Sequence, residues 1–422
     1  MTQLPTTTHG RVVRTVTLDG IDEDLLALLP RAGGHAWVRG QSGFVGWGEA
    51  ARITISGPER FSRAQRWWNE WCEQAHVDDH VLLPGTGPVA FASFTFDNGP
   101  GESVVIVPAV LVGHRRGRTW LTTVESDPAV AAGSPHQEQT AAPVGPIAWS
   151  TGTRPVEHWA RAVAEAIGRI SAGELDKVVL ARDIVAELPS ALDGAGLLAR
   201  LAAAFPECWT FNVDGLLGAT PELLVRRDGD RVTSRVLAGT VRRRGDESVD
   251  AGLAAALLAS DKDLEEHEYA VHSVAESLAA HCTDLDVPIA PRVLALANVQ
   301  HLATDITGRL ADGAPALALA ASLHPTAAVC GTPTERAGAL IRELEGMDRG
   351  RYAGPVGWID SRGDGEFGIA LRCAAVEDSP RGPATRLRLY AGCGIVAGSS
   401  AEAEIAESEA KLDAIRKALS AG

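Results

Sequence analysis

Short runs of apolar and β-branched residues dominate the first 124 residues of the chain. Most of these runs end at Gly, Pro, Asp or Asn, which is typical of strands joined by turns. The predicted strands cover residues 12–18, 44–55, 89–96, 104–112 and 119–124. A helical pattern over residues 60–75 carries Trp67, Trp68 and Trp71 on one flank, and packing into the core is their expected role. Residues 125–155 contain few large apolar side chains and are predicted to form a loop or linker.

From residue 156 onwards, helical and strand patterns alternate. Helical periodicity predicts helices over residues 156–172, 263–280, 334–344 and 401–418. The predicted strands cover residues 177–188, 209–213, 223–226, 231–236, 354–359, 368–373 and 386–391. Because the strands come in adjacent pairs as often as singly, we predict an α/β fold of the α+β type. Its sheets are expected to be mixed or largely antiparallel and covered by helices.

The composition is that of an ordinary globular protein, with 45% hydrophobic and 22% charged residues. The 39 Lys and Arg residues against 54 Asp and Glu give a net charge of −15, so the average surface repels phosphate backbones and anionic membranes. We therefore expect no nucleic-acid and no membrane partner. The six cysteines are widely spaced, and the sequence shows neither a signal-peptide pattern nor a long apolar segment. These features predict a cytoplasmic location.

Two acidic pairs are candidates for binding a cation. Asp263 and Glu266 lie three residues apart in one predicted helix, and Glu404 and Glu407 have the same spacing in another. Each pair borders the apolar stripe of its helix, since successive residues turn by about 100°. Oxygen ligands from two helices suit Mg²⁺. Solvated acidic helix faces are common and would explain the same pattern. Phosphate-loop, nucleophile-elbow and H-E-x-x-H zinc motifs are absent.

A set of short motifs in fixed order resembles the chorismate-utilising enzymes. The motifs are KVVLAR from Lys177, ATPELL from Ala219, LAGT from Leu237, the acidic segment 263–267, NVQHL from Asn298, LHPT from Leu323, GTP from Gly331, GMDRGRYAGPVGW from Gly346 and GCGIV from Gly392, followed by Glu404, Glu407 and Lys411. The N-terminal third fits more loosely. The resemblance implies a single chorismate-binding domain over residues 1–422, with a less specific sheet part over 1–124, a loop over 125–155 and a catalytic part over 156–422.

The LHPT and YAGPVGW stretches are most similar to the isochorismate synthases of that family. This resemblance implies Mg²⁺-dependent isomerisation of chorismate to isochorismate, in which water adds at C2 while the C4 hydroxyl departs. It gives Lys177 the role of the base and Glu222 the role of the acid. A lysine needs desolvation or a nearby cation to act as a base, and a glutamic acid needs burial or neighbouring carboxylates to keep its proton. Without the resemblance, an exposed strand-end lysine and a turn glutamate would be the simpler interpretations.

The resemblance also implies which side chains bind the metal and the substrate. The carboxylates implied at the Mg²⁺ site are Glu266 and Glu407, with Asp263 and Glu404 in water-mediated or supporting roles. The residues implied to contact chorismate are Gly239, Thr240, His301, Thr326, Tyr352, Arg372, Gly392, Gly394 and Lys411. Arginine suits a planar carboxylate because its fork donates two parallel hydrogen bonds, and glycines let the backbone approach closely. For His301 and Thr326, a purely structural role in the core is an equal alternative.

Two other functions stay open at this point. A salicylate synthase would add pyruvate elimination to the same chemistry, and Tyr352 and Leu371 are residue types that also occur in those relatives. A catalytically inactive chorismate-binding protein belongs to a different class, and the presence of both Lys177 and Glu222 argues against it. The downstream pathway could be that of menaquinone, a siderophore or salicylate. The oligomeric state is not specified, and a monomer is plausible.

Overall fold

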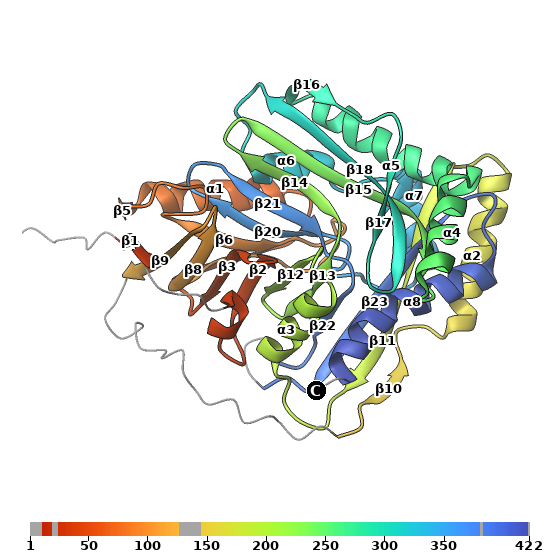
Figure 1. The fold of residues 1–422 in the computed structure, drawn as a ribbon, viewed down its shortest axis with the longest axis horizontal. Coiled ribbons are helices and arrows are strands. Elements are labelled where there is room, and N and C mark those ends of the chain that lie inside the picture. Colours follow the sequence, from red (N-terminus) through yellow and green to blue (C-terminus); the bar gives the residue numbers. More distant parts are fainter. Residues whose placement is uncertain (1–10, 19–23, 126–144, 380–382, 421–422) are drawn as a thin grey trace, which may run out of the picture.

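Eight α-helices and one short 3-10 helix surround two β-sheets in the part of the chain that the computed structural model describes, residues 11–18, 24–125, 145–379 and 383–420 (Figure 1). The helices are η1 (Leu25–Leu28), α1 (Arg60–Glu73), α2 (Val156–Ser171), α3 (Gly194–Ala204), α4 (Glu247–Leu258), α5 (Asp261–Ala279), α6 (Ala316–Leu323), α7 (Thr334–Leu344) and α8 (Ala401–Ser420). The four helices predicted after residue 156 correspond to α2, α5, α7 and α8, and the tryptophan helix corresponds to α1.

The larger sheet has thirteen strands and combines both ends of the chain. In spatial order they are β10 (Ala148–Thr151), β11 (Lys177–Glu187), β23 (Arg386–Ile395), β22 (Cys373–Val376), β13 (Leu216–Thr220), β12 (Trp209–Val213), β2 (His35–Arg39), β3 (Ser42–Trp47), β8 (Val110–Arg115), β9 (Arg118–Glu125), β1 (Arg11–Leu18) and β5 (Ala75–Asp79), with β19 (Gly331–Thr332) beside β11. The β1 and β5 pair is parallel, whereas the other pairs are antiparallel. This arrangement is the mixed sheet that the sequence predicts.

The second sheet has ten strands, all paired antiparallel. Their order is β16 (Cys282–Asp286), β18 (Val299–Leu310), β15 (Arg231–Arg242), β14 (Leu223–Asp228), β21 (Gly365–Ile369), β20 (Pro355–Asp360), β6 (Val89–Ser93), β7 (Ser103–Val107) and β4 (Ala51–Ile55), with β17 (Arg292–Ala295) beside β18. Strands from residues 1–124 pair with later strands in both sheets, since β2 joins β12 and β6 joins β20. The division into one domain with three parts stays a prediction.

Three predicted strands are each split between the two sheets. Residues 44–55 form β3 and β4, residues 104–112 form β7 and β8, and residues 368–373 contribute to β21 and β22. The first break contains Gly48 at a φ of 68°, a conformation that favours glycine, and the second contains Pro108, which cannot donate to a ladder. The second and third breaks are largely buried, so the hydrophobic pattern alone did not reveal them, whereas the exposed Gly48 and Glu49 mark the first one.

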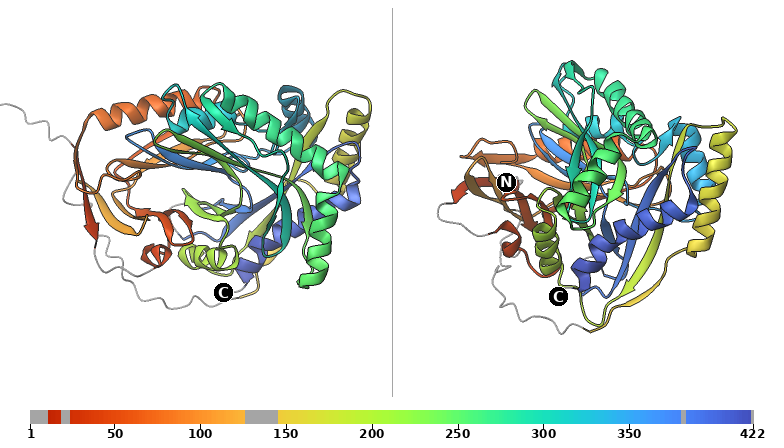
Figure 2. Two further views of the ribbon diagram at one scale, coloured as in Figure 1. Left: turned by 45° about the horizontal axis from the view of Figure 1, so that its top comes forward. Right: turned by 45° about the vertical axis from the view of Figure 1, so that its right-hand side comes forward.

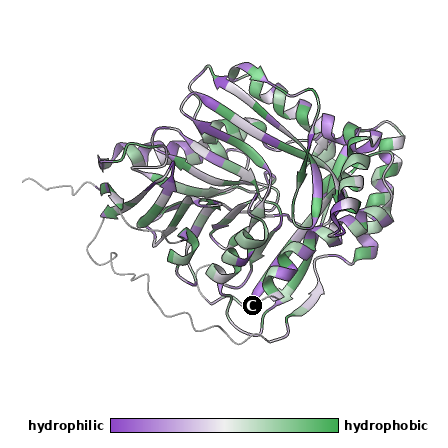
Figure 3. Ribbon diagram, viewed as in Figure 1, coloured by the Kyte–Doolittle hydropathy of each residue, from purple (hydrophilic) through white to green (hydrophobic). Residues whose placement is uncertain are grey.

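The core lies between the sheets and beneath the helices. Phe44 from the larger sheet packs edge-on against Trp358 of the smaller one, with ring centroids 4.6 Å apart. Helices α5 and α6 pack against the smaller sheet, whereas α2, α7 and α8 pack against β11 and β23 of the larger one (Figures 1 and 2). Hydrophobic residues follow the central strands, and hydrophilic residues are frequent on the surrounding helices (Figure 3). Within the described residues, none of the helices is both long and apolar enough to cross a membrane.

Candidate active site

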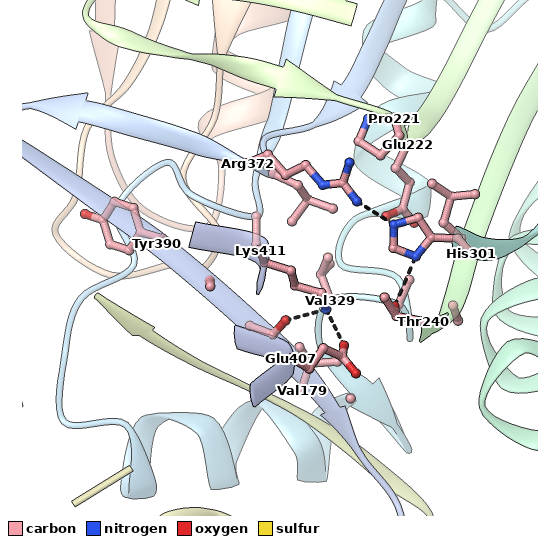
Figure 4. A pocket seen from close by; sticks show the side chains of 18 of the residues that line it. Val179, Pro221, Glu222, Thr240, His301, Val329, Arg372, Tyr390, Glu407 and Lys411 are labelled. Atoms are coloured by element: carbon pink, nitrogen blue, oxygen red, sulfur yellow. Dashed lines mark hydrogen bonds and ion pairs between the residues drawn. The ribbon is translucent and has the colours of Figure 1, made fainter. Parts of the chain in front are cut away.

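A cavity lies where the chain passes between the two sheets. Glu222 lies where the chain leaves β13 of the larger sheet and enters β14 of the smaller one. Arg372 lies where the chain leaves β21 of the smaller sheet and enters β22 of the larger one. The predicted site residues that line this cavity are Glu222, Gly239, Thr240, Glu266, His301, Tyr352, Arg372, Gly392, Gly394, Glu407 and Lys411. Residues separated by almost 190 positions in the chain therefore form one site (Figure 4).

One wall of the cavity is a hydrogen-bonded chain of three side chains. Thr240 and His301 are direct cross-strand partners on β15 and β18, next to a bulge at Gly239, whose φ is 75°. His301 Nδ1 lies 3.0 Å from Thr240 Oγ1, and Arg372 Nη2 contacts His301 Nε2 (Figure 4). Because a guanidinium can only donate, Nε2 of His301 must accept, and the proton lies on Nδ1. Burial, followed by the charge of Arg372, holds the pKa of His301 well below its ordinary value.

Glu222 is a buried carboxylic acid beside cationic groups. Its residue is only 4% exposed, and burial raises its pKa from 4.5 to about 8, although the Leu237 backbone N–H and the charges of Lys177, Lys411 and Arg372 act in the opposite direction. A carboxyl group with that pKa holds its proton at neutral pH. The environment that the acid role requires is therefore present, and desolvation rather than a neighbouring carboxylate produces it.

A second wall is formed by the end of β23 and by α8. Lys411 Nζ donates to the Gly392 carbonyl at 2.8 Å and forms an ion pair with Glu407 Oε1 at 2.6 Å. Burial opposes the charge of Lys411, but the Glu407 carboxylate outweighs it, and the pKa of Lys411 is raised. A Cβ atom on Gly392 would lie 3.1 Å from Tyr352 Oη, and one on Gly394 would lie 2.0 Å from Glu266 Oε1. The glycines thus allow two polar side chains to reach the backbone of β23.

Three glutamates near this wall each form an ion pair with a different lysine. The pairs are Lys177 with Glu266 at 3.1 Å, Lys262 with Glu404 at 3.1 Å and Lys411 with Glu407 at 2.6 Å. Carboxylate oxygens of Glu404 and Glu407 and the Cys393 sulfur lie within 4.8 Å of one another. Burial and then the charge of Glu407 raise the pKa of Glu404, which shows that the two carboxylates repel each other. Of the carboxylates expected to bind a cation, Glu404 and Glu407 on α8 therefore lie close together, and whether they bind one with Glu266 and Asp263 of α5 stays a prediction.

Four predicted residues do not line the cavity. Lys177 is wholly buried, with its ammonium group 3.1 Å from Glu266 Oε1, and the Glu404 side chain is 3% exposed. Asp263 accepts a hydrogen bond from the Ser260 hydroxyl at the start of α5 and lies against Gly239. Thr326 is 2% exposed, and its hydroxyl has no hydrogen-bond partner among the described residues. These four residues form a layer around the cavity rather than its surface.

Several cavity residues were not predicted from the sequence. Arg349 and Tyr390 both line the cavity; Tyr390 stacks on Tyr352 with ring centroids 4.9 Å apart. Arg349 lies inside the GMDRGRYAGPVGW motif, which is a signal for the segment, but the charged neighbours Asp348 and Arg351 leave no local feature that singles it out. Tyr390 follows an alternating strand pattern that is typical of core residues, and no local signal distinguishes it.

The fold and this site define a chorismate binding enzyme. The family model with that description matches residues 37–420, and the chain belongs to this family. The salicylate biosynthesis isochorismate synthase of Pseudomonas aeruginosa is 35% identical over 413 residues, which cover 91% of this chain and 84% of that protein.

Other similar proteins are also isochorismate synthases. The isochorismate synthase DhbC of Bacillus subtilis is 41% identical over 275 residues, which cover 62% of this chain and 68% of that protein. The solved structure of MenF, the menaquinone-specific isochorismate synthase of Escherichia coli, superposes with a TM-score of 0.79 at 26% identity. That alignment covers 97% of this chain and 95% of the MenF chain.

Proposed function

We propose that this protein is an isochorismate synthase, which converts chorismate to isochorismate. The observation that carries this proposal is the buried acid Glu222, which shares one cavity with the cations Arg372 and Lys411 and with the carboxylates Glu266 and Glu407. Chorismate is a dianion that needs cationic partners for its carboxylates, and its rearrangement needs a proton donor. The names of the similar proteins support the same activity.

The cavity provides partners for the carboxylate of the enolpyruvyl group. The Arg372 guanidinium and the Lys411 ammonium group both reach the cavity, and Tyr352 adds a hydroxyl donor. Arg372 has its backbone in the left-handed region at a φ of 48°, and one of its two terminal nitrogens is already bound to His301. The other, Nη1, is buried without a hydrogen-bond partner among the described residues, and a carboxylate oxygen that reached it would satisfy this donor.

In the proposed reaction, a new C2–O bond forms with water while the C4–O bond breaks and the double bonds shift between these carbons. Lys177 takes the proton from the attacking water, and Glu222 gives a proton to the departing C4 hydroxyl, so that water is consumed and released in equal amounts. Lys177 begins β11 behind the cavity surface and is paired with Glu266, whereas Glu222 lies on the surface at the junction of β13 and β14. Such positioned proton transfers typically contribute about 10²–10⁴-fold each.

The carboxylates on α5 and α8 fit a magnesium ion. Glu266 and Glu407 would hold it, with Asp263 and Glu404 in supporting roles, because hard oxygen ligands from two helices match the preference of Mg²⁺. The mutual repulsion of Glu404 and Glu407 supports this assignment, since a bound cation relieves it. When bound, the metal would neutralise the ring carboxylate of the substrate. Glu266 and Glu407 would then exchange their lysine partners for the metal.

The activity is tested by incubating the protein with chorismate and Mg²⁺ and separating the products by chromatography. We expect isochorismate. Salicylate together with pyruvate would identify the alternative, a salicylate synthase. Unchanged chorismate, in the presence of saturable chorismate binding, would identify a catalytically inactive binding protein and refute the proposal. A cytoplasmic location also stays a proposal, which the six unpaired cysteines favour.

A further inference from the structure

We propose that Glu345 and Arg349, a buried ion pair, are positioning residues for the reaction. They complete an unpaired stretch at the edge of β11 and so fix the position of Lys177 relative to the neighbouring loop at Val329, which lines the same cavity. Their side chains are 1% and 3% exposed, which makes this one of the most deeply buried ion pairs among the described residues. The inference rests on the proposed function for the role of Lys177.

Strand β11 is paired along one whole edge but only at both ends of the other. On the first edge, residues from Val178 to Glu187 pair with β23. On the second edge, β19 pairs with Lys177 and Val178, the Cys330 carbonyl accepts the Val179 N–H, and β10 begins to pair only at Ile184. The carbonyl of Val179 and the N–H of Ala181 therefore have no strand beside them.

The ion pair supplies the hydrogen bonds that a neighbouring strand would make. Glu345 Oε1 accepts the Ala181 N–H at 2.7 Å, and Arg349 Nη2 donates to the Val179 carbonyl at 2.7 Å. One acceptor and one donor are presented side by side, as in a β-ladder. Leaving these two buried backbone groups unpaired would be unfavourable. The carboxylate and guanidinium are themselves held together, with Arg349 Nε donating to Glu345 Oε2 at 2.9 Å.

Arg349 also connects β11 to the loop before β19, which lies beside the same edge of the strand. Its Nη1 donates to the Val329 carbonyl at 2.9 Å, and its guanidinium lies over the Phe96 ring at 4.1 Å from the centroid. Val179 and Val329 both line the cavity. Lys177 lies two residues before Val179 on the same strand, so the two side chains share one face of β11. A single guanidinium thus sets the distance between the strand of the proposed base and the neighbouring loop, and both segments line the cavity.

The mechanism proposed above does not use Glu345 or Arg349, and the ion pair between them satisfies their charges within the protein. Arg349 is consequently not needed to bind a substrate carboxylate. Its function is geometric, since misplacing a reacting group by about 1 Å can lower a rate by about 100-fold. Lysine cannot replace it, because an ammonium group lacks the planar fork that joins Glu345, Val179 and Val329 at once.

The test compares Arg349→Lys and Glu345→Gln with the matched control Glu343→Gln. Glu343 lies in the last turn of α7, two residues before Glu345, but its ion pair with Arg169 is at the surface. In both test variants we expect kcat for isochorismate formation to fall about tenfold or more, with KM for chorismate changed less than about threefold. Hydrogen exchange at the Ala181 amide should accelerate, while exchange along β23 stays unchanged. Glu343→Gln should match the wild-type protein in each measurement.

A purely stabilising pair would lower the melting temperature but leave kcat of the folded protein unchanged. Wild-type kcat in folded Arg349→Lys and Glu345→Gln would therefore overturn the inference, as would failure of both variants to fold while Glu343→Gln folds. A loss of kcat/KM that arises from a higher KM with unchanged kcat would also overturn the inference, because such a loss would indicate a substrate-binding role. If the wild-type protein makes no isochorismate, the proposed function fails instead, and the exchange measurement at Ala181 still tests the local geometry.

Discussion

Replacing Glu222 with glutamine should affect both the rate and the pH dependence of stability. Glutamine has nearly the same size and keeps a neutral side chain in the buried position, but it cannot give a proton to the departing hydroxyl. We expect kcat to fall about 10²–10⁴-fold, the usual contribution of a positioned acid. In the wild-type protein, kcat should fall as the pH rises through about 8, since burial raises the pKa of Glu222 to about 8.

The magnitude of the stability effect follows from the same pKa. The pKa in the folded protein, about 8, exceeds the ordinary value of 4.5, so the folded state binds more protons than the unfolded state between these values. The stabilisation is fully present below the unfolded pKa and is lost as the pH rises through the folded one. Between about pH 6 and pH 8, Glu222 should cost the wild-type protein about 2 kcal/mol of unfolding free energy, and this loss should be absent in Glu222→Gln.

The assay is urea unfolding of both proteins at several pH values across this range, without Mg²⁺, together with steady-state rates of isochorismate formation. The difference in unfolding free energy between variant and wild type should grow as the pH rises. A constant difference would show that the carboxyl group does not titrate in this range and would refute the explanation from burial. A kcat of Glu222→Gln within about tenfold of the wild-type value would refute the acid role.

Three further substitutions test other parts of the site. Lys177→Ala should lower kcat about 10²–10⁴-fold while chorismate, measured by calorimetry with Mg²⁺, still binds; a normal rate would contradict the base role. Glu407→Gln should raise the Mg²⁺ concentration for half-maximal activity about tenfold or more, and an unchanged Mg²⁺ dependence would count against the metal site. Gly394→Ala should weaken Mn²⁺ binding, followed by electron paramagnetic resonance, because its Cβ would lie 2.0 Å from Glu266 Oε1; wild-type affinity would show that Glu266 is free to move.

Five of the eight described α-helices and the two acidic pairs were predicted from the sequence, whereas α3, α4 and α6 were not. Glu404 and Glu407 lie on one flank of α8 because the helical turn is fixed, and the start of β11 at Lys177 follows from a long β-branched run. The placement of residues relative to the cavity surface was less predictable. The cavity is lined by Glu222 and Arg372, which lie at the junctions of two sheets, whereas Lys177 and Thr326 lie behind its surface. No local pattern specifies where a chain leaves one sheet and enters another.

The sequence by itself determined the local elements, the family resemblance and the set of chemical groups, because periodicity and motifs depend on neighbouring residues. Only the tertiary structure decided how these groups act on one another. The raised pKa of Glu222 results from desolvation by residues that are distant in the chain, and the hydrogen bonds of Glu345 and Arg349 exist because one edge of β11 lacks a strand. Burial and long-range pairing are properties of the packed sheets, so a linear pattern of residues could not specify them.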